Sequence, residues 1–227
     1  MAVKRFQQYC PVAHALDLVG ERWSLLIVRE LQNGPLRYTD LADSLRGCGT
    51  NILAARLKDL DAAGIVRKTK LPPPAASTVY ELTQYGRELE EVLHALGRWG
   101  ARSLGPPSPD DLLRPGWSLN MARCTFRPEA ARGFEARYEL RFPDDEVMTL
   151  RVYDAEVEPT PGPAGPDVDL VLETDPPTMF ELVAKTITPR EAVASGRARI
   201  EGELDELDKL VALFSFEPIG VDEPAPV

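Results

Sequence analysis

A proline-rich segment interrupts the chain near its middle and separates two differently patterned parts. Residues 105–116 read Gly-Pro-Pro-Ser-Pro-Asp-Asp-Leu-Leu-Arg-Pro-Gly, and a helical pattern ends where this segment begins. Proline lacks the amide hydrogen that a helix needs, so a helix does not continue through it. A length of 227 residues suits two small domains. We therefore predict one domain over residues 1–104, a linker over 105–116, a second domain over 117–217 and a tail over 218–227.

The two parts also differ in charge. Residues 1–105 hold 14 Lys and Arg against 11 Asp and Glu, a net charge of +3, whereas residues 106–227 hold 12 against 25, a net charge of −13. Together they account for the net charge of −10 of the whole chain. DNA phosphates repel an acidic surface, so any contact with nucleic acid is expected in the first part.

Several protein classes are disfavoured by what the sequence lacks. The longest aliphatic run, Leu25–Val28, is too short to cross a bilayer, and no apolar region follows Lys4 and Arg5 as a secretion signal requires. The three cysteines are odd in number, and neither they nor His14 and His94 have metal-ligand spacing. No P-loop, G-x-S-x-G or H-E-x-x-H motif is present. We expect a cytoplasmic protein with no catalytic residues, metal or cofactor.

Apolar residues in the first part recur at the spacing of short helices. Pro11 suits the first turn of a helix in which Val12, Leu16 and Val19 recur until Gly20. Two further helices are expected, over residues 22–32, with an apolar face of Trp23, Leu26, Ile27 and Leu31, and over residues 38–45.

A fourth helix has the pattern of a DNA-reading element. Thr50 is a good N-cap, and Leu53, Leu57 and Leu60 follow at i, i+4 and i+7, which predicts one buried stripe. Small residues let a helix backbone approach DNA, and Asn, Thr and Lys can contact base edges or phosphates. The face opposite the stripe has this composition, with Asn51, Ala54, Ala55 and Lys58.

A basic hairpin and a long helix complete the first domain. The run Ile65–Lys70 carries three basic residues, and Val79–Leu82 can return as its partner strand, which is the plan of a winged helix. Residues 72–76, at the tip, carry no charge, so contacts to phosphate are expected from the stems. Thr83 is expected to cap a long helix, and its apolar stripe is interpreted in part as a dimer interface of Leu89, Val92, Leu93, Leu96 and Trp99.

Four sequence blocks occur in a fixed order in this part. They are Cys10-Pro-Val-Ala-His-Ala-Leu-Asp-Leu-Val-Gly-Glu-Arg-Trp23, Gly34-Pro-Leu-Arg-Tyr38, Leu57–Val66 and Tyr80-Glu-Leu-Thr-Gln-Tyr-Gly86. Over residues 10 to about 104 the chain thereby resembles HxlR-type regulators, which are relatives of the MarR winged-helix group. The resemblance implies a homodimeric transcription factor, usually a repressor, that reads a pseudo-palindromic site in double-stranded DNA. It implies DNA contacts from Thr50, Asn51, Ala54 and Lys58 in the recognition helix, and from Lys68, Lys70, Ser77 and Thr78 in the wing.

Apolar and charged residues alternate in the second part, as they do along the strands of a half-buried sheet. Phe134, Ala136, Tyr138, Leu140 and Phe142 are expected to face one way, and the charged residues between them, Glu139 included, to face solvent. Further strands are expected over residues 148–152, 168–172 and 197–201, and helices from Asp175, from the capping box Thr188–Glu191 and around Leu204–Phe214. We predict an α+β domain, an antiparallel sheet with one face covered by helices.

This order of elements, with Ala192–Gly202 before the last helix, is similar to the sterol carrier protein fold over about residues 117–216. The resemblance implies a tunnel for lipids or other apolar molecules. Apolar alternation needs only packing, so for each candidate lining residue the alternative is a place in the core. The candidates are Tyr138, Leu140, Phe142, Met148, Met179, Phe180, Leu207, Leu210 and Phe214.

Cys10 stands before the N-terminus of a helix, where the helix dipole lowers the pKa of a thiol and favours a reactive thiolate. HxlR-type proteins with a cysteine at this place include redox and electrophile sensors; an inert thiol is the alternative.

We therefore predict a transcriptional regulator that binds operator DNA as a homodimer. Its second domain is expected to bind an apolar small molecule or lipid that modulates operator binding, with no contact to a membrane. Two alternatives stay open. In one, Cys10 chemistry rather than a ligand releases DNA; in the other, the second domain is a lipid carrier or an enzyme, and DNA binding is secondary.

Overall fold

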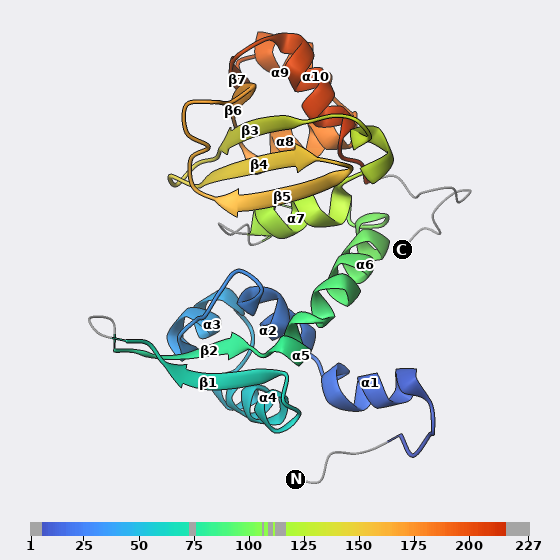
Figure 1. The fold of residues 1–227 in the computed structure, drawn as a ribbon, viewed down its shortest axis with the longest axis vertical. Helices are drawn as coiled ribbons and strands as arrows, with labels where there is room; N and C mark the ends of the chain where they lie inside the picture. Colours follow the sequence, from blue (N-terminus) through green and yellow to red (C-terminus); the bar gives the residue numbers. More distant parts are fainter. Residues whose placement is uncertain (1–5, 73–75, 106, 109–110, 112–116, 217–227) are drawn as a thin grey trace. The chain divides into compact units, whose positions relative to one another are not determined.

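The computed structural model describes residues 6–72, 76–105, 107–108, 111 and 117–216, and the remaining residues, including most of the predicted linker, lie outside this description. The chain divides into two compact units, residues 1–93 and 94–227 (Figure 1). The boundary falls inside helix α6 (Leu89–Ala101). Each unit has its own hydrophobic core.

Four helices begin the N-terminal unit: α1 (Pro11–Val19), α2 (Ser24–Leu31), α3 (Tyr38–Ser44) and α4 (Thr50–Ala62). The second helix begins two residues later than predicted, because Trp23 has a left-handed backbone (φ 83°) that is incompatible with a helix. The predicted apolar face of α1 is wrong at Val12 and Leu16, which are exposed, but is confirmed at Val19, which is buried together with Ala13. Similarly, Leu26 is exposed, and Ile27, Val28 and Leu31 are the core residues of α2.

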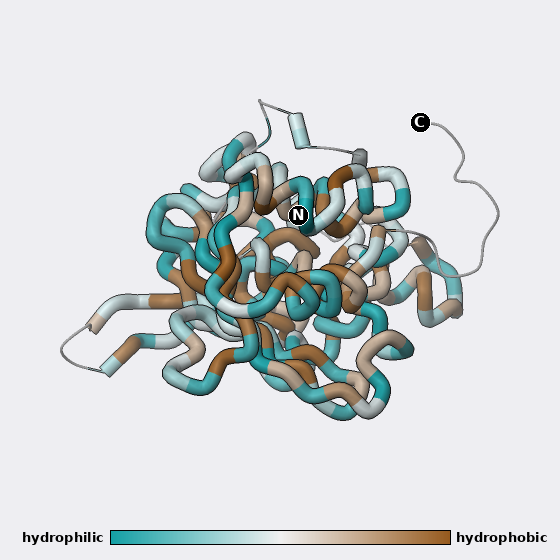
Figure 2. The backbone as a smooth tube through the Cα atoms, turned by 90° about the horizontal axis from the view of Figure 1, so that it is seen from above, coloured by the Kyte–Doolittle hydropathy of each residue, from teal (hydrophilic) through white to brown (hydrophobic). Residues whose placement is uncertain are grey.

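A hairpin of β1 (Val66–Lys70) and β2 (Thr78–Leu82) follows and projects away from the helices of its unit (Figures 1 and 2). The strands are antiparallel, with Lys68 opposite Tyr80. Leu36 adds a short bridge to the hairpin, because its amide and carbonyl pair with those of Tyr80 at 3.0 and 2.8 Å. Part of the predicted hairpin tip, residues 73–75, lies outside the described residues.

The helix after the hairpin is interrupted, which differs from the prediction. Thr83 caps the one-turn helix α5 (Gln84–Arg87) by accepting a hydrogen bond from the Gly86 amide, and α6 begins after Glu88. Gly86 packs directly on the backbone of Ile65, the residue before β1. A Cβ at position 86 would overlap the carbonyl oxygen of Ile65. Only glycine therefore allows α5 to lie this close to the start of the hairpin.

The C-terminal unit contains a five-stranded sheet in the order β5-β4-β3-β6-β7. Three neighbouring pairs are antiparallel, but β3 and β6 run parallel, so the prediction of an antiparallel sheet is wrong at this position. The physical reason is the connection: β5 lies at one edge, and the chain must cross the sheet to place β6 on the other side of β3. The strands are β3 (Ala136–Arg141), β4 (Val147–Tyr153), β5 (Glu156–Pro161), β6 (Leu170–Thr174) and β7 (Ala198–Glu201).

Helices complete this unit. Asp175 caps α8 (Pro176–Val183) by accepting a hydrogen bond from the Thr178 amide, and Thr188 and Glu191 form the predicted capping box of α9 (Pro189–Ala194). Side chains from the sheet and from four of the helices form one core. The other helical elements are α7 (Trp117–Thr125), the 3-10 turn Pro128–Ala131 and α10 (Leu204–Ala212).

Glu139 was expected in solvent but is buried, with 5% of its surface exposed. The segment after β5 covers it: the Ala164 amide donates to its carboxylate at 2.9 Å, and Arg141 donates at 2.7 Å. Arg141 also pairs with Glu201 at 3.1 Å. The hydrogen bond from Ala164 and the neighbouring Arg141 hold the pKa of Glu139 below its usual value. This face of the sheet is therefore held together by a charged network.

Candidate nucleic-acid interface and ligand site

Helix α4 presents the face that the sequence predicts for DNA. Leu53, Leu57 and Leu60 are fully buried in the N-terminal core, so the helix is fixed along one side. On the other side the four predicted contact residues, Thr50, Asn51, Ala54 and Lys58, are all exposed.

The start of α4 differs from the prediction in one detail. Gly49, not Thr50, is the N-cap: its backbone is extended, and its carbonyl accepts hydrogen bonds from the amides of Ile52 and Leu53 at 2.9 and 3.0 Å. Thr50 is the first helical residue, and its carbonyl accepts a hydrogen bond from the Tyr38 hydroxyl at 2.8 Å. This bond joins the beginning of α4 to α3, and the Thr50 side chain is left at the surface.

Charges on α4 are distributed unevenly along its length. Lys58 forms no ion pair with any described residue. Arg56 is engaged within the unit, by Asp59 at 3.1 Å and Glu21 at 3.6 Å. The exposed acid Asp61 stands near the C-terminal end of α4. The first two turns therefore have an exposed surface without acids, as a helix needs if its N-terminal part is to enter a major groove.

The hairpin brings further cations to the surface. Arg67 is paired with Glu81 across the strands at 2.8 Å, so its charge is neutralised. Lys68 extends over the Tyr80 ring, with Nζ 5.8 Å from the ring centroid, and remains exposed. Of the other predicted wing contacts, Lys70 and Thr78 are exposed, whereas Ser77 is partly buried and its carbonyl accepts a hydrogen bond from the Leu71 amide at 2.9 Å.

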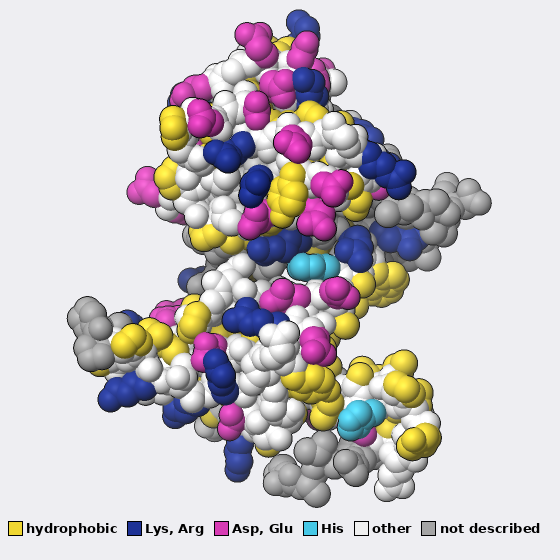
Figure 3. All heavy atoms as spheres, viewed as in Figure 1, with side chains coloured by type: hydrophobic (Ala, Val, Ile, Leu, Met, Phe, Trp, Pro, Cys, Tyr) yellow, Lys and Arg dark blue, Asp and Glu magenta, His cyan; other side chains and the backbone are white. Residues whose placement is uncertain are grey.

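The five residues predicted for the dimer interface fall into two groups. Leu89 and Leu93 are partly buried against the core of the N-terminal unit. Val92, Leu96 and Trp99 are 51%, 45% and 69% exposed and follow one another at i, i+4 and i+7 along α6. Sequence reasoning missed a second apolar surface, on α1, where Val12 and Leu16 are exposed (Figure 3).

The three cysteines have different environments. Cys10 is exposed at the N-cap position of α1. Cys48 is buried, and burial raises the pKa of its thiol. Cys124 is partly buried on α7, and burial raises the pKa of its thiol although Arg98 and Arg123 oppose this. Cys10 is thus the most accessible thiol of the three.

The nine candidate ligand-lining residues of the C-terminal unit lie in or beside its core. Phe142 and Met179 pack partly buried against that core, and Phe180 stacks on Phe216 with ring centroids 4.7 Å apart. The other six are at most 3% exposed: Tyr138, Leu140, Met148, Leu207, Leu210 and Phe214.

Two hydroxyl groups in this core lack a hydrogen-bond partner among the described residues. They belong to Tyr138 and Thr178, which are both fully buried. Burial is the main reason that the pKa of Tyr138 is raised. An unpaired buried hydroxyl costs roughly 1–3 kcal/mol, so each would gain from a water molecule or from a polar atom of a ligand.

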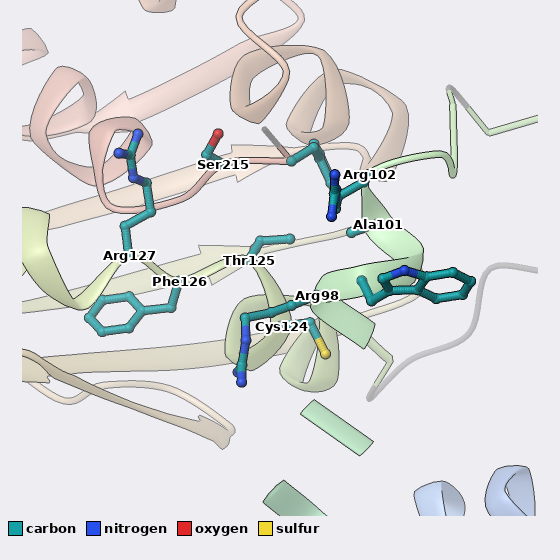
Figure 4. A pocket seen from close by; sticks show the side chains of 10 residues that line it. Arg98, Ala101, Arg102, Cys124, Thr125, Phe126, Arg127 and Ser215 are labelled. Atoms are coloured by element: carbon teal, nitrogen blue, oxygen red, sulfur yellow. The ribbon is translucent and has the colours of Figure 1, made fainter. Parts of the chain in front are cut away.

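A surface hollow lies elsewhere in the C-terminal unit, between α6, α7 and the chain after α10. Its volume is about 230 Å³. In Figure 4 the side chains of Arg98, Arg102 and Arg127 lie on different sides of Thr125. Sequence reasoning missed this hollow; Arg98 lies on α6, and Arg102 follows one residue after the end of that helix. The lining residues are Arg98, Trp99, Ala101, Arg102, Cys124, Thr125, Phe126, Arg127, Ser215 and Phe216.

Among the described residues, no helix combines the length and the apolar character needed to cross a membrane. Within the same residues, no group of three or more His, Cys, Asp or Glu side chains is placed to hold a metal ion.

Comparison with known proteins gives separate matches for the two parts of the chain. Residues 18–107 match the HxlR-like helix-turn-helix family. The HTH-type transcriptional regulator sll1512 of Synechocystis is 39% identical over 111 residues, which are 49% of this chain and 82% of that protein. The HTH-type transcriptional regulator YodB of Bacillus subtilis is 32% identical over 98 residues, 43% of this chain and 88% of YodB. A solved structure of quinone-bound YodB has a TM-score of 0.35 and 30% identity, and covers 40% of this chain and 97% of that one.

Residues 124–218 match the alkyl sulfatase C-terminal family, so this finding does not point specifically to sterol carrier proteins. The sec-alkylsulfatase Pisa1 from Pseudomonas sp. has a solved structure with a TM-score of 0.41 and 18% identity. The match covers 45% of this chain but only 16% of the length of Pisa1. The sterol-carrier resemblance therefore stays a prediction.

Proposed function

The chain belongs to the HxlR-like helix-turn-helix family of transcriptional regulators, and we propose that it binds operator DNA as a homodimer and responds to a small molecule held by its C-terminal unit. The observation that carries the proposal is the face of α4: a buried leucine stripe on one side, and exposed Thr50, Asn51, Ala54 and Lys58 on the other. In this proposal α4 enters the major groove and the hairpin lies along the phosphate backbone.

The proposed contacts follow from side-chain chemistry. Asn51 can form two hydrogen bonds with an adenine edge, and Ala54 lets the helix backbone come close to the bases. Lys58, Lys68 and Lys70 offer ammonium groups to phosphates, which bind with a strong dependence on salt. Repression is the mode of regulation that we propose, on family resemblance.

The proposed dimer interface is the stripe of Val92, Leu96 and Trp99 on α6. Three large apolar side chains in a row on an exposed helix face indicate a surface that another chain covers. A two-fold related copy of the same helix would bury the stripe against itself, as a symmetric dimer requires.

For the C-terminal unit we propose a ligand-binding role, with a fold like that of sterol carrier proteins. The two buried hydroxyls of Tyr138 and Thr178, which lack a hydrogen-bond partner among the described residues, support a ligand with a polar atom beside the apolar candidates of this core. Such a ligand changes transcription only if it binds DNA-competent and DNA-incompetent states with different affinity. The fusion of the two units motivates this coupling.

The test is selection of duplexes from a random DNA pool by the full chain, followed by fluorescence anisotropy with the enriched duplex. We expect the enriched sequences to form an inverted repeat. Asn51→Ala should weaken binding to the enriched duplex by about 1–3 kcal/mol, roughly 5- to 150-fold, and change the preferred base. Gln84→Ala, an exposed amide on α5, is the matched control and should leave affinity unchanged. Failure to enrich any sequence would contradict the proposal.

A thiol switch is the second candidate function, favoured by the exposure of Cys10 at the start of α1. Under this alternative, diamide releases the protein from its duplex, and Cys10→Ser abolishes that response while a response to ligand persists. Unchanged release of Cys10→Ser by diamide would exclude it.

A further inference from the structure

The hollow between α6, α7 and the chain after α10 differs in charge from its surroundings. Residues 106–227 carry a net charge of −13, and acidic side chains are spread over the C-terminal unit (Figure 3). The described residues that line the hollow nevertheless include three arginines and no acid. A cationic hollow in an acidic domain favours an anionic occupant, because guanidinium groups are the only charges among these described lining residues.

Two of these arginines have no charge partner among the residues that the structure describes. Arg98 and Arg102 form no hydrogen bond or ion pair with a described residue, whereas Arg127 pairs with Glu129 at 2.9 Å. Each guanidinium offers N–H donors in a planar fork that matches a carboxylate or sulfonate group. One anionic group can therefore be bound without breaking an existing contact of Arg98 or Arg102.

The rest of the wall is apolar in large part. Phe126 and Ala101 are buried, Phe216 is partly buried, and Trp99 stands at the rim. The volume of about 230 Å³ lies below the roughly 300–1,000 Å³ of sites for drug-sized ligands. The occupant should thus be small, with one charged end and an apolar body.

We propose that this hollow binds a small organic anion, a medium-chain or aromatic acid, with its acidic group held by Arg98 and Arg102 and its apolar body against Phe126 and Phe216. This inference rests on the proposed ligand-binding role of the C-terminal unit and gives that role a ligand class and a surface site, which shares no described lining residue with the nine apolar candidates of the core. It places the charged end of the ligand at the C-terminal end of α6, the helix that also carries the proposed dimer stripe, with Arg98 on the helix and Arg102 just beyond it.

The packing of α6 supports a rigid wall. Gly97 lies directly against Cys124 on α7, so closely that a Cβ at position 97 would overlap the sulfur atom. Cys124 itself lines the hollow. Occupancy should therefore shield this thiol from reagents in solution, which provides a readout that needs no DNA.

The experiment compares three probes of one chain length, octanoate, octanol and octylammonium, by calorimetric titration of the full chain. We expect octanoate to bind at least about tenfold more tightly than octanol, a difference of about 1.4 kcal/mol, and octylammonium not to bind. The double variant Arg98→Gln/Arg102→Gln should lose this preference. Arg190→Gln, an exposed arginine on α9 outside the hollow, should keep it. Equal binding of octanoate and octanol, or octanoate binding by the double variant as tight as by the parent, would overturn the inference.

A second readout uses cysteine alkylation followed by mass spectrometry. Octanoate should slow the modification of Cys124 several-fold and leave Cys10, the exposed internal control, unchanged. Equal rates for Cys124 with and without octanoate would overturn the inference even if the arginine variants were unstable.

A measurement of DNA binding distinguishes failure of this inference from failure of the proposed function. The double variant without octanoate should bind the enriched duplex as the parent does. A large loss of DNA affinity in that variant would assign the arginines to phosphate contact and overturn the ligand site. Intact DNA binding without octanoate binding would overturn the ligand site alone.

Discussion

The two units of this chain use their charged residues in different ways. In the N-terminal unit Lys58 and Lys70 project from α4 and the hairpin without an ion pair among the described residues. In the C-terminal unit several arginines are paired with acids, in Arg141–Glu139, Arg151–Glu158, Arg197–Glu181 and Arg199–Glu173. A paired charged side chain already has a partner within the protein, whereas an unpaired one remains available to bind a ligand. On this criterion Arg98 and Arg102 resemble the lysines of the first unit.

The two units also have separate cores. Leu57→Ala, the variant with the largest expected effect, tests whether they unfold separately. Removing this fully buried side chain should lower the free energy of unfolding of the N-terminal unit by about 2–5 kcal/mol. Scanning calorimetry should show the transition of the C-terminal unit unchanged, because its core is separate. Lys58→Ala, exposed on the same helix, is the control and should change stability by no more than about 0.5 kcal/mol. Equal shifts of both transitions would mean that the units unfold together.

Glu139→Gln tests the charged network of the second unit. The pKa of Glu139 is lowered in the folded state, so its contribution to stability is present above the ordinary glutamate pKa of about 4.3 and is lost as the pH falls through the lowered value. The variant should be less stable at pH 7 by about 1–3 kcal/mol and should lose less stability on acidification. Urea unfolding at pH 7 and at pH 4 measures both effects. Glu173→Gln, which removes an exposed ion pair, should change neither the stability at pH 7 nor the loss of stability on acidification.

Lys68→Ala has the smallest expected effect and tests the unpaired cations of the first unit. It should weaken binding to all duplexes alike and reduce the slope of log K against log salt by about 1. Anisotropy titrations over a range of salt concentrations measure this slope. Lys209→Ala, which removes a lysine already paired with Glu206 in the acidic unit, should leave the slope unchanged. An unchanged slope for Lys68→Ala would remove the hairpin from the proposed interface.

Sequence reasoning succeeded best where a helix has two distinct faces. The leucine stripe of α4 and its exposed opposite side follow from a period of 3.6 residues, and both are found in the structure. The N-cap of α4 was missed by one residue, because the Gly49 backbone serves where a side chain was expected. The start of α2 was missed because nothing in the sequence announces the left-handed Trp23.

In the second unit, local patterns say less about the fold. Strand β5 was not predicted, since Glu156, Glu158, Pro159 and Pro161 are poor strand residues, and it forms at the edge, where proline is tolerated. The parallel pairing of β3 with β6 depends on a connection across the sheet, which alternation does not reveal. The lining of a container and the filling of a core use the same apolar alternation, so sequence could not separate them.

The double hydrogen bond between Leu36 and Tyr80 has a consequence for how the hairpin can bend. It fixes the middle of β2 to the chain between α2 and α3, so deformation on contact with a duplex is confined to the strand pairs beyond Lys68 and Tyr80. The amides of Leu36 and Tyr80 should exchange slowly and at matching rates in deuterium oxide, because one opening event frees both. The tip of the hairpin then moves relative to this fixed strand pair, and amide exchange at Leu36 and Tyr80 measures how often the two hydrogen bonds open.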